Sequence, residues 1–200
     1  MHPQIYLASQ SSRRRELLEQ IGIYPRVMTA DVDESPHPKE APVEYVIRLA
    51  LEKAKTVQAR LRDHEMLPVL AADTAVVVGG EILGKPISRD NALAMMQQLS
   101  DRSHKVLTGV ALVDRHKVRS RLSVSHVTFR QINEAEALAY WDSGEPQDKA
   151  GGYAIQGLGA MFISHLEGSY SGVMGLPLFE TAELLRLAGF EVLSALNDKK

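Results

Sequence analysis

Apolar and polar residues at the start of the chain follow first a strand pattern and then a helix pattern. Residues 4–8 form an apolar run typical of a short buried strand, and residues 9–12 form a polar, serine-rich turn. Apolar residues at helical spacing then predict a helix over residues 13–20, which ends at Gly22. This order directs the unpaired N–H groups of the helix start toward the turn.

A short strand, a loop and the longest helix are expected next. Residues 26–28 read as a strand, whereas residues 31–42 combine acids with three prolines and are typical of a loop. Residues 43–61 carry apolar side chains along one helical face.

Two β-like runs follow, at residues 68–72 and 75–78, and we expect Asp73 and Thr74 to interrupt them because both are poor residues for a buried strand. Gly79-Gly80 then separates two apolar runs, which predicts a hairpin turn.

The second half of the chain predicts three helices among several strands. The expected elements are a helix over 88–99 capped by Ser88, strands over 105–113 and 118–132, a helix to Trp141 that begins with a capping box of Asn133 and Glu136, a β-like region over 151–166 and a helix over 177–188. Because hairpins interrupt the alternation of helix and strand, we expect an α/β fold with one mixed twisted sheet and flanking helices, as a single domain over residues 1–200.

Composition limits the classes of function. A chain of 200 residues can bury one sizeable core, and a net charge of -2 with a pI near 6.4 gives no general attraction to nucleic acid polymers. A small anionic ligand needs only a local cluster of cations. The absence of cysteine excludes disulfides and thiolate chemistry, and no apolar run predicts a secretory signal or a membrane span. We therefore expect a cytoplasmic protein without a membrane partner.

The serine-rich turn is the first candidate for chemistry. Ser9 and Ser11 precede Arg13, Arg14 and Arg15 at a predicted helix start, where free N–H groups and a partial positive charge favour phosphate. The alternative is a solvated basic first turn, although cations there oppose the helix dipole. Consecutive helical residues diverge, so the three arginines cannot all face one site.

Asp73 is the second candidate, because a carboxylate within an apolar run must be paired, capped or bound to a metal. The alternative is an aspartate satisfied by backbone N–H groups at a kink. Asp31, Asp33 and Glu34 could supply a second carboxylate, although such a run is more often a solvated loop.

Two further segments carry weaker signals. Gly79, Gly84 and Lys85 match the spacing of a phosphate-binding P-loop, but Pro86 takes the place of its Ser or Thr, so we retain only Lys85 as a point charge for phosphate. Gln156 lies among glycines and could read a base edge, although by itself the segment favours a polar turn.

Taken together, these segments resemble the Maf family of nucleotide pyrophosphatases. The resemblance runs from about residue 7 to residue 187 and rests on the number and order of eight motifs: LASQSSRR (7–14), DVDES (31–35), LALEKA (49–54), AADT (71–74), GKP (84–86), HKVLTGV (104–110), SGEPQDKAGGYAIQG (143–157) and GSYSGVMGLPL (168–178). The chain departs from the family pattern at Gly172, where asparagine is frequent.

The resemblance implies an inosine-triphosphatase-like fold with two lobes around a cleft, and hydrolysis of a nucleoside triphosphate to the monophosphate and pyrophosphate. It implies Asp73 as the proton acceptor, and Asp73 with Glu34 as ligands of a divalent metal, which is expected to be magnesium, with manganese as the alternative. Lys53, Lys85, Ser9 and Ser11 would line the triphosphate site. Whether Asp73 acts as a base or as a metal ligand stays open.

The resemblance also implies a substrate class. Arg13, Thr74 and Gln156 match the residues of the subgroup that hydrolyses dTTP and UTP, whereas another subgroup prefers 7-methyl-GTP. The alternatives are an enzyme for modified nucleotides and a nucleotide-binding regulator of cell division without turnover. A homodimer is a further expectation.

Overall fold

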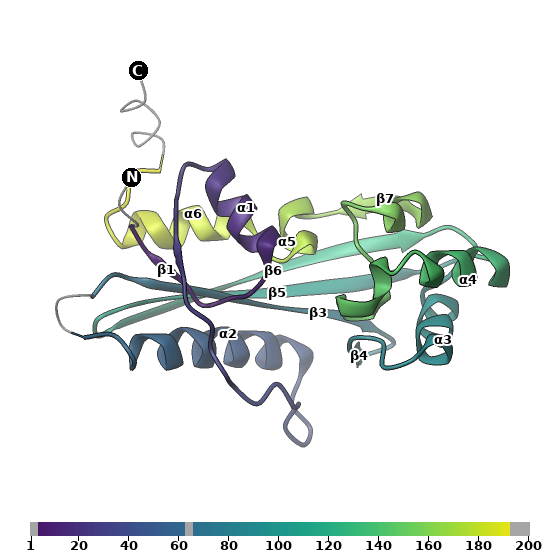
Figure 1. The fold of residues 1–200 in the computed structure, drawn as a ribbon, viewed down its shortest axis with the longest axis horizontal. Helices are drawn as coiled ribbons and strands as arrows, with labels where there is room; N and C mark the ends of the chain where they lie inside the picture. Colours follow the sequence, from purple (N-terminus) through teal and green to yellow (C-terminus); the bar gives the residue numbers. More distant parts are fainter. Residues whose placement is uncertain (1–3, 63–65, 193–200) are drawn as a thin grey trace.

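One mixed seven-stranded sheet organises the protein. The computed structural model describes residues 4–62 and 66–192, and the strands follow the order β2-β1-β3-β5-β6-β7, with β4 paired to β3 (Figure 1). The strands are β1 (Tyr6–Leu7), β2 (Arg26–Val27), β3 (Val69–Val78), β4 (Glu81–Leu83), β5 (Ser103–Asp114), β6 (Lys117–Phe129) and β7 (Ile163–Glu167). β1 is parallel to β2 and β3, whereas the other pairs are antiparallel, so the expected mixed α/β sheet is confirmed.

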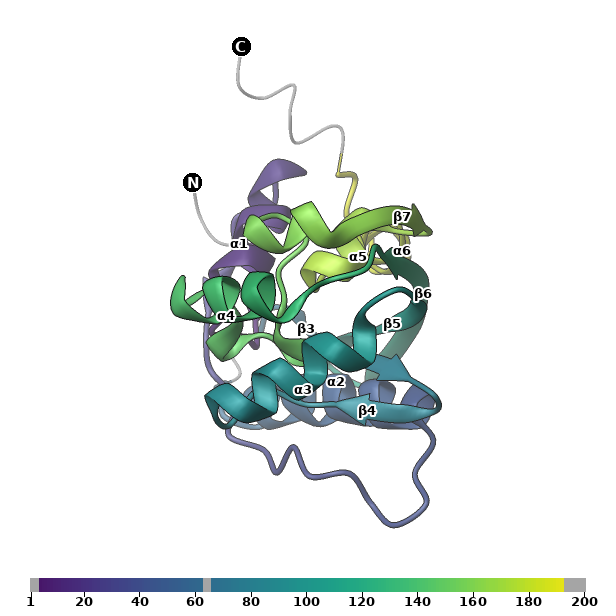
Figure 2. The ribbon, with the colours of Figure 1, turned by 90° about the vertical axis from the view of Figure 1, so that its right-hand side faces the viewer.

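Helices cover both faces of the sheet. They are α1 (Ser12–Gln20), α2 (Pro42–Gln58), α3 (Arg89–Leu99), α4 (Glu134–Asp142), α5 (Tyr170–Met174) and α6 (Leu178–Leu187), with 3-10 turns at Glu145–Asp148, Ala150–Gly152 and Leu158–Phe162. Figure 1 shows α2 on one face and α1 with α6 on the other, while α3 and α4 lie at the far end of the long strands. Figure 2 views the molecule from that end.

Alternation along β3 explains these layers. Ala71 and Ala75 face α2 and pack in cores with the apolar side of that helix, whereas Leu70 and Ala72 face the core shared with α1 and α6. A further core at the far end joins α3 and α4 through Met96, Leu99, Phe129, Tyr140, Tyr153 and Phe162. The two ends of the sheet therefore form two lobes, as the sequence predicts.

A gap in the sheet lies at the middle of β3. On the side away from β5, β1 pairs with Val69 and Leu70, and β4 pairs with residues 76–78. Among the described strands, none pairs with residues 71–75 on that side. Side chains that point to either face of β3 can therefore be reached from this open edge. Asp73 and Thr74 lie in this gap.

Two predictions from the pattern are wrong. β3 runs without interruption through Asp73 and Thr74, because both residues pair with β5, opposite Gly109 and Thr108. Residues 151–162 form 3-10 turns and irregular loop rather than strand, and only residues 163–166 join β7. Gly151 and Gly152 have positive φ angles of 67° and 69°, which a strand does not permit. The short helix α5 is not predicted by the pattern.

Within residues 4–62 and 66–192, every helix is too short or too polar to cross a membrane.

His104 makes stability depend on pH. It lies buried at the start of β5 against the edges of Phe129 and Tyr153, with Nε2 2.8 Å from the Tyr153 hydroxyl oxygen. Burial lowers the pKa of His104 to about 4 from its ordinary 6.5. The unfolded chain therefore binds a proton more readily than the folded protein, and the free energy of unfolding falls as the pH falls from 6.5 toward 4, by on the order of 3 kcal/mol in full.

Replacement of His104 by glutamine removes this titration while it keeps a polar group beside Tyr153. We expect the loss of free energy of unfolding between pH 7 and pH 4.5, measured by urea titration, to be smaller in His104→Gln than in the unaltered protein. Equal losses in the two proteins would contradict the assignment.

Candidate active site

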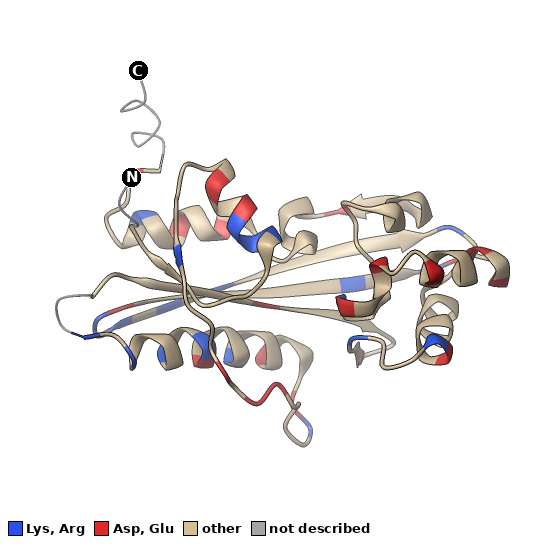
Figure 3. Ribbon diagram, in the orientation of Figure 1, with Lys and Arg blue, Asp and Glu red and all other residues tan. Residues whose placement is uncertain are grey.

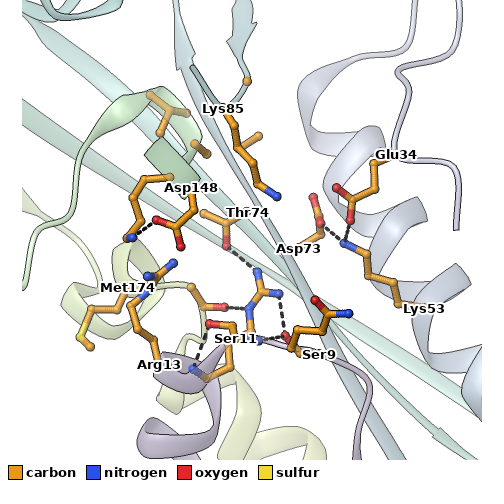
Figure 4. Close-up of a pocket in the computed structure, with 18 of the residues that line it drawn as sticks. Ser9, Ser11, Arg13, Glu34, Lys53, Asp73, Thr74, Lys85, Asp148 and Met174 are labelled. Carbon is orange, nitrogen blue, oxygen red and sulfur yellow. Dashed lines mark hydrogen bonds and ion pairs between the residues drawn. The ribbon is translucent and has the colours of Figure 1, made fainter. Parts of the chain in front are cut away.

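A large cavity opens at the gap in the sheet. Its volume is about 1050 Å³, and its walls come from the β1–α1 turn, the loop before α2, α2 itself, β3, β4, residues 148–156 and α5 (Figure 4). Both lobes therefore contribute to it, as expected of a cleft between them. The cavity brings together the residues that the resemblance assigns to a site, which are Ser9, Ser11, Arg13, Glu34, Lys53, Asp73, Thr74, Lys85 and Gln156. Their roles stay predictions.

A lysine joins two carboxylates on one side of the cavity. Lys53 Nζ lies 2.6 Å from Asp73 Oδ1 and 2.6 Å from Glu34 Oε1, as Figure 4 shows. Asp73 and Lys53 are buried, with exposed fractions of 7% and 8%, whereas the Glu34 side chain is 51% exposed. Asp73 is therefore neither capped at a kink nor free, and both carboxylates meet at a single cation.

A glycine permits this contact between α2 and the sheet. Gly109 lies opposite Asp73 on β5, and a Cβ atom there would lie 2.5 Å from the carbonyl oxygen of Val46 on α2. No side chain fits between the helix and the sheet at this point. The close approach of α2 lets Lys53 reach the carboxylate of Asp73.

The two carboxyl groups differ in acidity. Burial raises the pKa of Asp73, and the charges of Lys53 and Arg14 offset only part of this effect. Burial also acts to raise the pKa of Glu34, but the hydrogen bond and charge of Lys53 outweigh it and leave this pKa below its ordinary value. Asp73 is thus the more basic of the two carboxylates.

Side chains of α2 hold the loop that carries Glu34. The Tyr45 hydroxyl donates to the Glu34 carbonyl at 2.9 Å, and Arg48 donates to both carboxylate oxygens of Glu40 and to the Ser35 carbonyl. In Figure 3 the loop that carries Glu34 contains red segments, and α2, which follows it in the chain, contains several blue segments. These contacts fix the loop whose acids the sequence leaves ambiguous.

Arg14 lies at the other side of the gap, in the first turn of α1. Its Nε donates to the Gly175 carbonyl at 2.7 Å, and its Nη1 and Nη2 donate to the hydroxyl oxygens of Ser9 and Thr74, each at 3.3 Å. Burial lowers the pKa of Arg14, with Asp73 acting in the opposite direction, but a guanidinium stays charged at neutral pH. The fixed fork leaves further N–H groups on Nη1 and Nη2 for a ligand.

The serine-rich turn shapes this helix start. Ser11 is the N-cap and accepts from the Arg14 N–H, while Ser9 Oγ accepts from the Ser11 N–H at 3.2 Å. Of the three arginines, Arg13 and Arg14 line the cavity, whereas Arg15 is exposed and pairs with Glu19 at 3.6 Å. The sequence could not say which arginines face the site.

Further charged groups form the wall from the second lobe. Lys85 follows β4 and points toward Asp73 in Figure 4. Asp148 forms an ion pair with Lys149, and both line the cavity near Arg13, whose charge helps to lower the pKa of Asp148 after the larger effect of Lys149. The pattern of residues 143–157 does not reveal Asp148 as part of a site.

Apolar side chains line the part of the cavity nearest the second lobe. Val76 on β3 and Val106 on β5 are cross-strand partners, on the same face of the sheet as Thr74. Ala154 and Val173 also line the cavity. Gln156 is exposed and also lines the cavity. The walls of the cavity therefore combine charged groups, apolar side chains and one polar amide.

Comparisons with known proteins identify relatives of this chain. A dTTP/UTP pyrophosphatase of Alkalilimnicola ehrlichii is 58% identical over 92% of each chain, and one of Bordetella avium is 51% identical over 94% of this chain and 96% of its own. The Ham1 protein of Staphylococcus aureus overlaps 62% of this chain and 71% of its own with a TM-score of 0.42 and 15% identity. The family model described as Maf-like protein matches residues 4–188, and the chain therefore belongs to the Maf family.

Proposed function

We propose that this protein hydrolyses dTTP and UTP to the nucleoside monophosphate and pyrophosphate. The observation that carries the proposal is the convergence of a buried carboxylate, Asp73, with four cationic side chains in one cavity of about 1050 Å³: Arg13, Arg14, Lys53 and Lys85. The relatives named dTTP/UTP pyrophosphatase support the substrate class.

The cations suit a triphosphate. A nucleoside triphosphate carries about four negative charges, and its transfer reactions depend on positioning and on electrostatic stabilisation. Arg14 offers a planar fork already held in place, whereas Lys85 offers a mobile point charge from the opposite lobe. Binding the substrate would neutralise the mutual repulsion of these cations.

A divalent metal, magnesium or manganese, is part of the proposal. The described residues contain no cluster of three or more His, Cys, Asp or Glu that could hold a metal alone. Asp73 and Glu34 nevertheless both line the cavity, and each has an oxygen in contact with the same Lys53 nitrogen, so the two carboxylates are neighbours. Hard carboxylate oxygens completed by substrate phosphates are typical of magnesium sites. Bound by these two residues, the ion would offset phosphate charge and polarise the α-phosphoryl group.

Asp73 is the group we assign to the attacking water. Burial raises the pKa of Asp73, whereas a bound divalent cation would lower it. Asp73 would therefore orient the water and accept its proton as the water oxygen bonds to the α-phosphorus. The bond from the α-phosphorus to the bridging oxygen breaks, and its electron pair leaves with pyrophosphate. Arg13, Arg14 and Lys85 would stabilise the charge of that leaving group.

Thr74 and Gln156 are the groups we assign to the pyrimidine. Thr74 accepts from Arg14 and shares a face of β3 with Val76, and Gln156 lines the same cavity. An amide can donate to O4 of uracil or thymine, and a hydroxyl oxygen can accept from their N3–H, so Gln156 and Thr74 together can pair with this edge of the base. We place the enzyme in the cytoplasm with its nucleotide substrates, and the homodimer stays a prediction.

A panel of substrates tests the proposed function. Purified protein with magnesium is given dTTP, UTP, CTP and 7-methyl-GTP, and pyrophosphate release is measured for each with and without a chelator. We expect metal-dependent release that is fastest with dTTP and UTP. Preference for 7-methyl-GTP would refute the substrate class, and binding of nucleotide without release would indicate a regulator.

The two neighbouring arginines provide a matched test of the phosphate site. Arg14→Lys keeps the charge but removes the fork, so we expect kcat/KM for dTTP to fall roughly tenfold, the scale of a lost charge-assisted hydrogen bond. Arg15→Lys changes an exposed side chain outside the cavity, and its kcat/KM should stay the same. Equal effects of both changes would contradict the assignment of Arg14.

A further inference from the structure

A buried chain of hydrogen bonds runs from α5 to the cavity through two threonines. Thr108 Oγ1 donates to the Gly172 carbonyl at 2.8 Å, and the Thr108 and Thr74 hydroxyl oxygens are 2.9 Å apart. Arg14 Nη2 donates to Thr74 Oγ1 at 3.3 Å. Thr108 is 1% exposed, so water cannot replace any of its partners.

The direction of every bond in this chain is determined. A carbonyl oxygen only accepts, so the single hydroxyl proton of Thr108 must point to Gly172. Thr74 therefore donates its own proton to Thr108, and the guanidinium of Arg14 donates to Thr74. The Thr74 oxygen retains one lone pair and has no proton left for a ligand.

This polarity matters for the choice of base. The ring of thymine or uracil carries an N3–H donor, whereas the corresponding N3 of cytosine is an acceptor. The Thr74 hydroxyl can only accept a hydrogen bond from the substrate. It can therefore pair with the N3–H of thymine or uracil, whereas with cytosine it would face N3, a second acceptor. A buried mismatch of this kind is a strong basis for discrimination.

We propose that Thr108 is a positioning residue for specificity, which fixes Thr74 as a hydrogen-bond acceptor and thereby selects dTTP and UTP against CTP. The inference rests on the proposed function and extends it to a residue that does not line the cavity. Gly172 takes part through its backbone carbonyl, so its lack of a side chain does not affect this role.

Thr108→Val tests the proposal, because it keeps the shape of the side chain and removes the hydroxyl. Thr74 can then turn its proton toward the substrate and pair with cytosine. We expect the ratio of kcat/KM for UTP to that for CTP to fall about tenfold, the scale of one hydrogen bond of ordinary net strength, without a fall in the value for CTP. Thr108→Ser restores the hydroxyl and should keep the ratio.

Thr181→Val is the matched control. Thr181 is fully buried on α6, and among the described residues its hydroxyl has no hydrogen-bond partner, so this change should leave the ratio as it is. An unchanged ratio in folded Thr108→Val, or an equal fall in Thr108→Ser, would overturn the proposal. Equal hydrolysis of UTP and CTP by the unaltered protein would overturn it while leaving the hydrolytic function intact, whereas no hydrolysis of either would refute the proposed function.

A pair of substrate analogues tests the polarity in the unaltered protein, and this test holds even if Thr108→Val does not fold. 3-methyl-UTP lacks the N3–H donor, whereas 5-methyl-UTP carries the same added methyl group and keeps the donor. We expect kcat/KM to fall about tenfold or more with 3-methyl-UTP relative to 5-methyl-UTP. Equal values would overturn the proposal.

Discussion

Asp73→Asn is expected to lower kcat for dTTP hydrolysis by about 10³-fold, within the range that a lost general base produces. The change keeps the size of the side chain but removes its negative charge and its capacity to accept a proton. Steady-state release of pyrophosphate from purified protein measures the effect.

The same change should not weaken the fold. Asparagine keeps an oxygen that can accept from Lys53, and Lys53 keeps its ion pair with Glu34. Burial, which raises the pKa of Asp73, disfavours the ionised carboxylate in the folded protein, so its neutral replacement relieves this cost. We therefore expect Asp73→Asn to melt at a temperature no lower than that of the unaltered protein. Asp142→Asn, at the exposed end of α4, is the control for loss of a negative charge, and near-normal kcat in Asp73→Asn would refute the catalytic assignment.

Lys53→Met is expected to lower kcat/KM for dTTP by about 10²-fold, because it removes a buried cation from the triphosphate site and leaves Asp73 and Glu34 without their common partner. The charge and hydrogen bond of Lys53 lower the pKa of Asp73, so their loss raises it further. The acid limb of the pH profile of kcat/KM should therefore move to higher pH.

Lys55→Met provides the comparison for this prediction. Lys55 lies two residues further along α2, is exposed and does not line the cavity with Lys53. Its replacement should leave both the rate and the position of the acid limb unchanged. A Lys53→Met protein with the acid limb of the unaltered protein would contradict the coupling between Lys53 and Asp73.

Local signals in the sequence predict local structure well. Ser88 caps α3 by accepting from the Asn91 N–H, and Asn133 with Glu136 forms the expected capping box of α4. Gly79-Gly80 forms the expected turn between β3 and β4. Each of these caps and turns depends on residues within four positions of one another, so a short stretch of sequence is enough to predict it.

Features that depend on distant partners are the ones that the pattern misses. Asp73 and Thr74 are poor strand residues, but pairing with β5 along their whole length keeps β3 continuous. The hydroxyl of Thr108 is oriented by its hydrogen bond to the carbonyl of Gly172, which lies 64 positions away in the chain. The local sequence around either residue does not indicate this contact. The resemblance to the Maf family identifies Asp73, Lys53 and Glu34, but only the structure places one ammonium between two carboxylates.

The proposed function depends on attack by water at the α-phosphorus of a nucleoside triphosphate in the cavity around Asp73. Hydrolysis of dTTP in water enriched with ¹⁸O, followed by mass spectrometry of both products, measures this step. We expect dTMP that carries one ¹⁸O atom and unlabelled pyrophosphate, in a metal-dependent reaction that Asp73→Asn nearly abolishes. Label in the pyrophosphate, or formation of dTDP and inorganic phosphate, would contradict it.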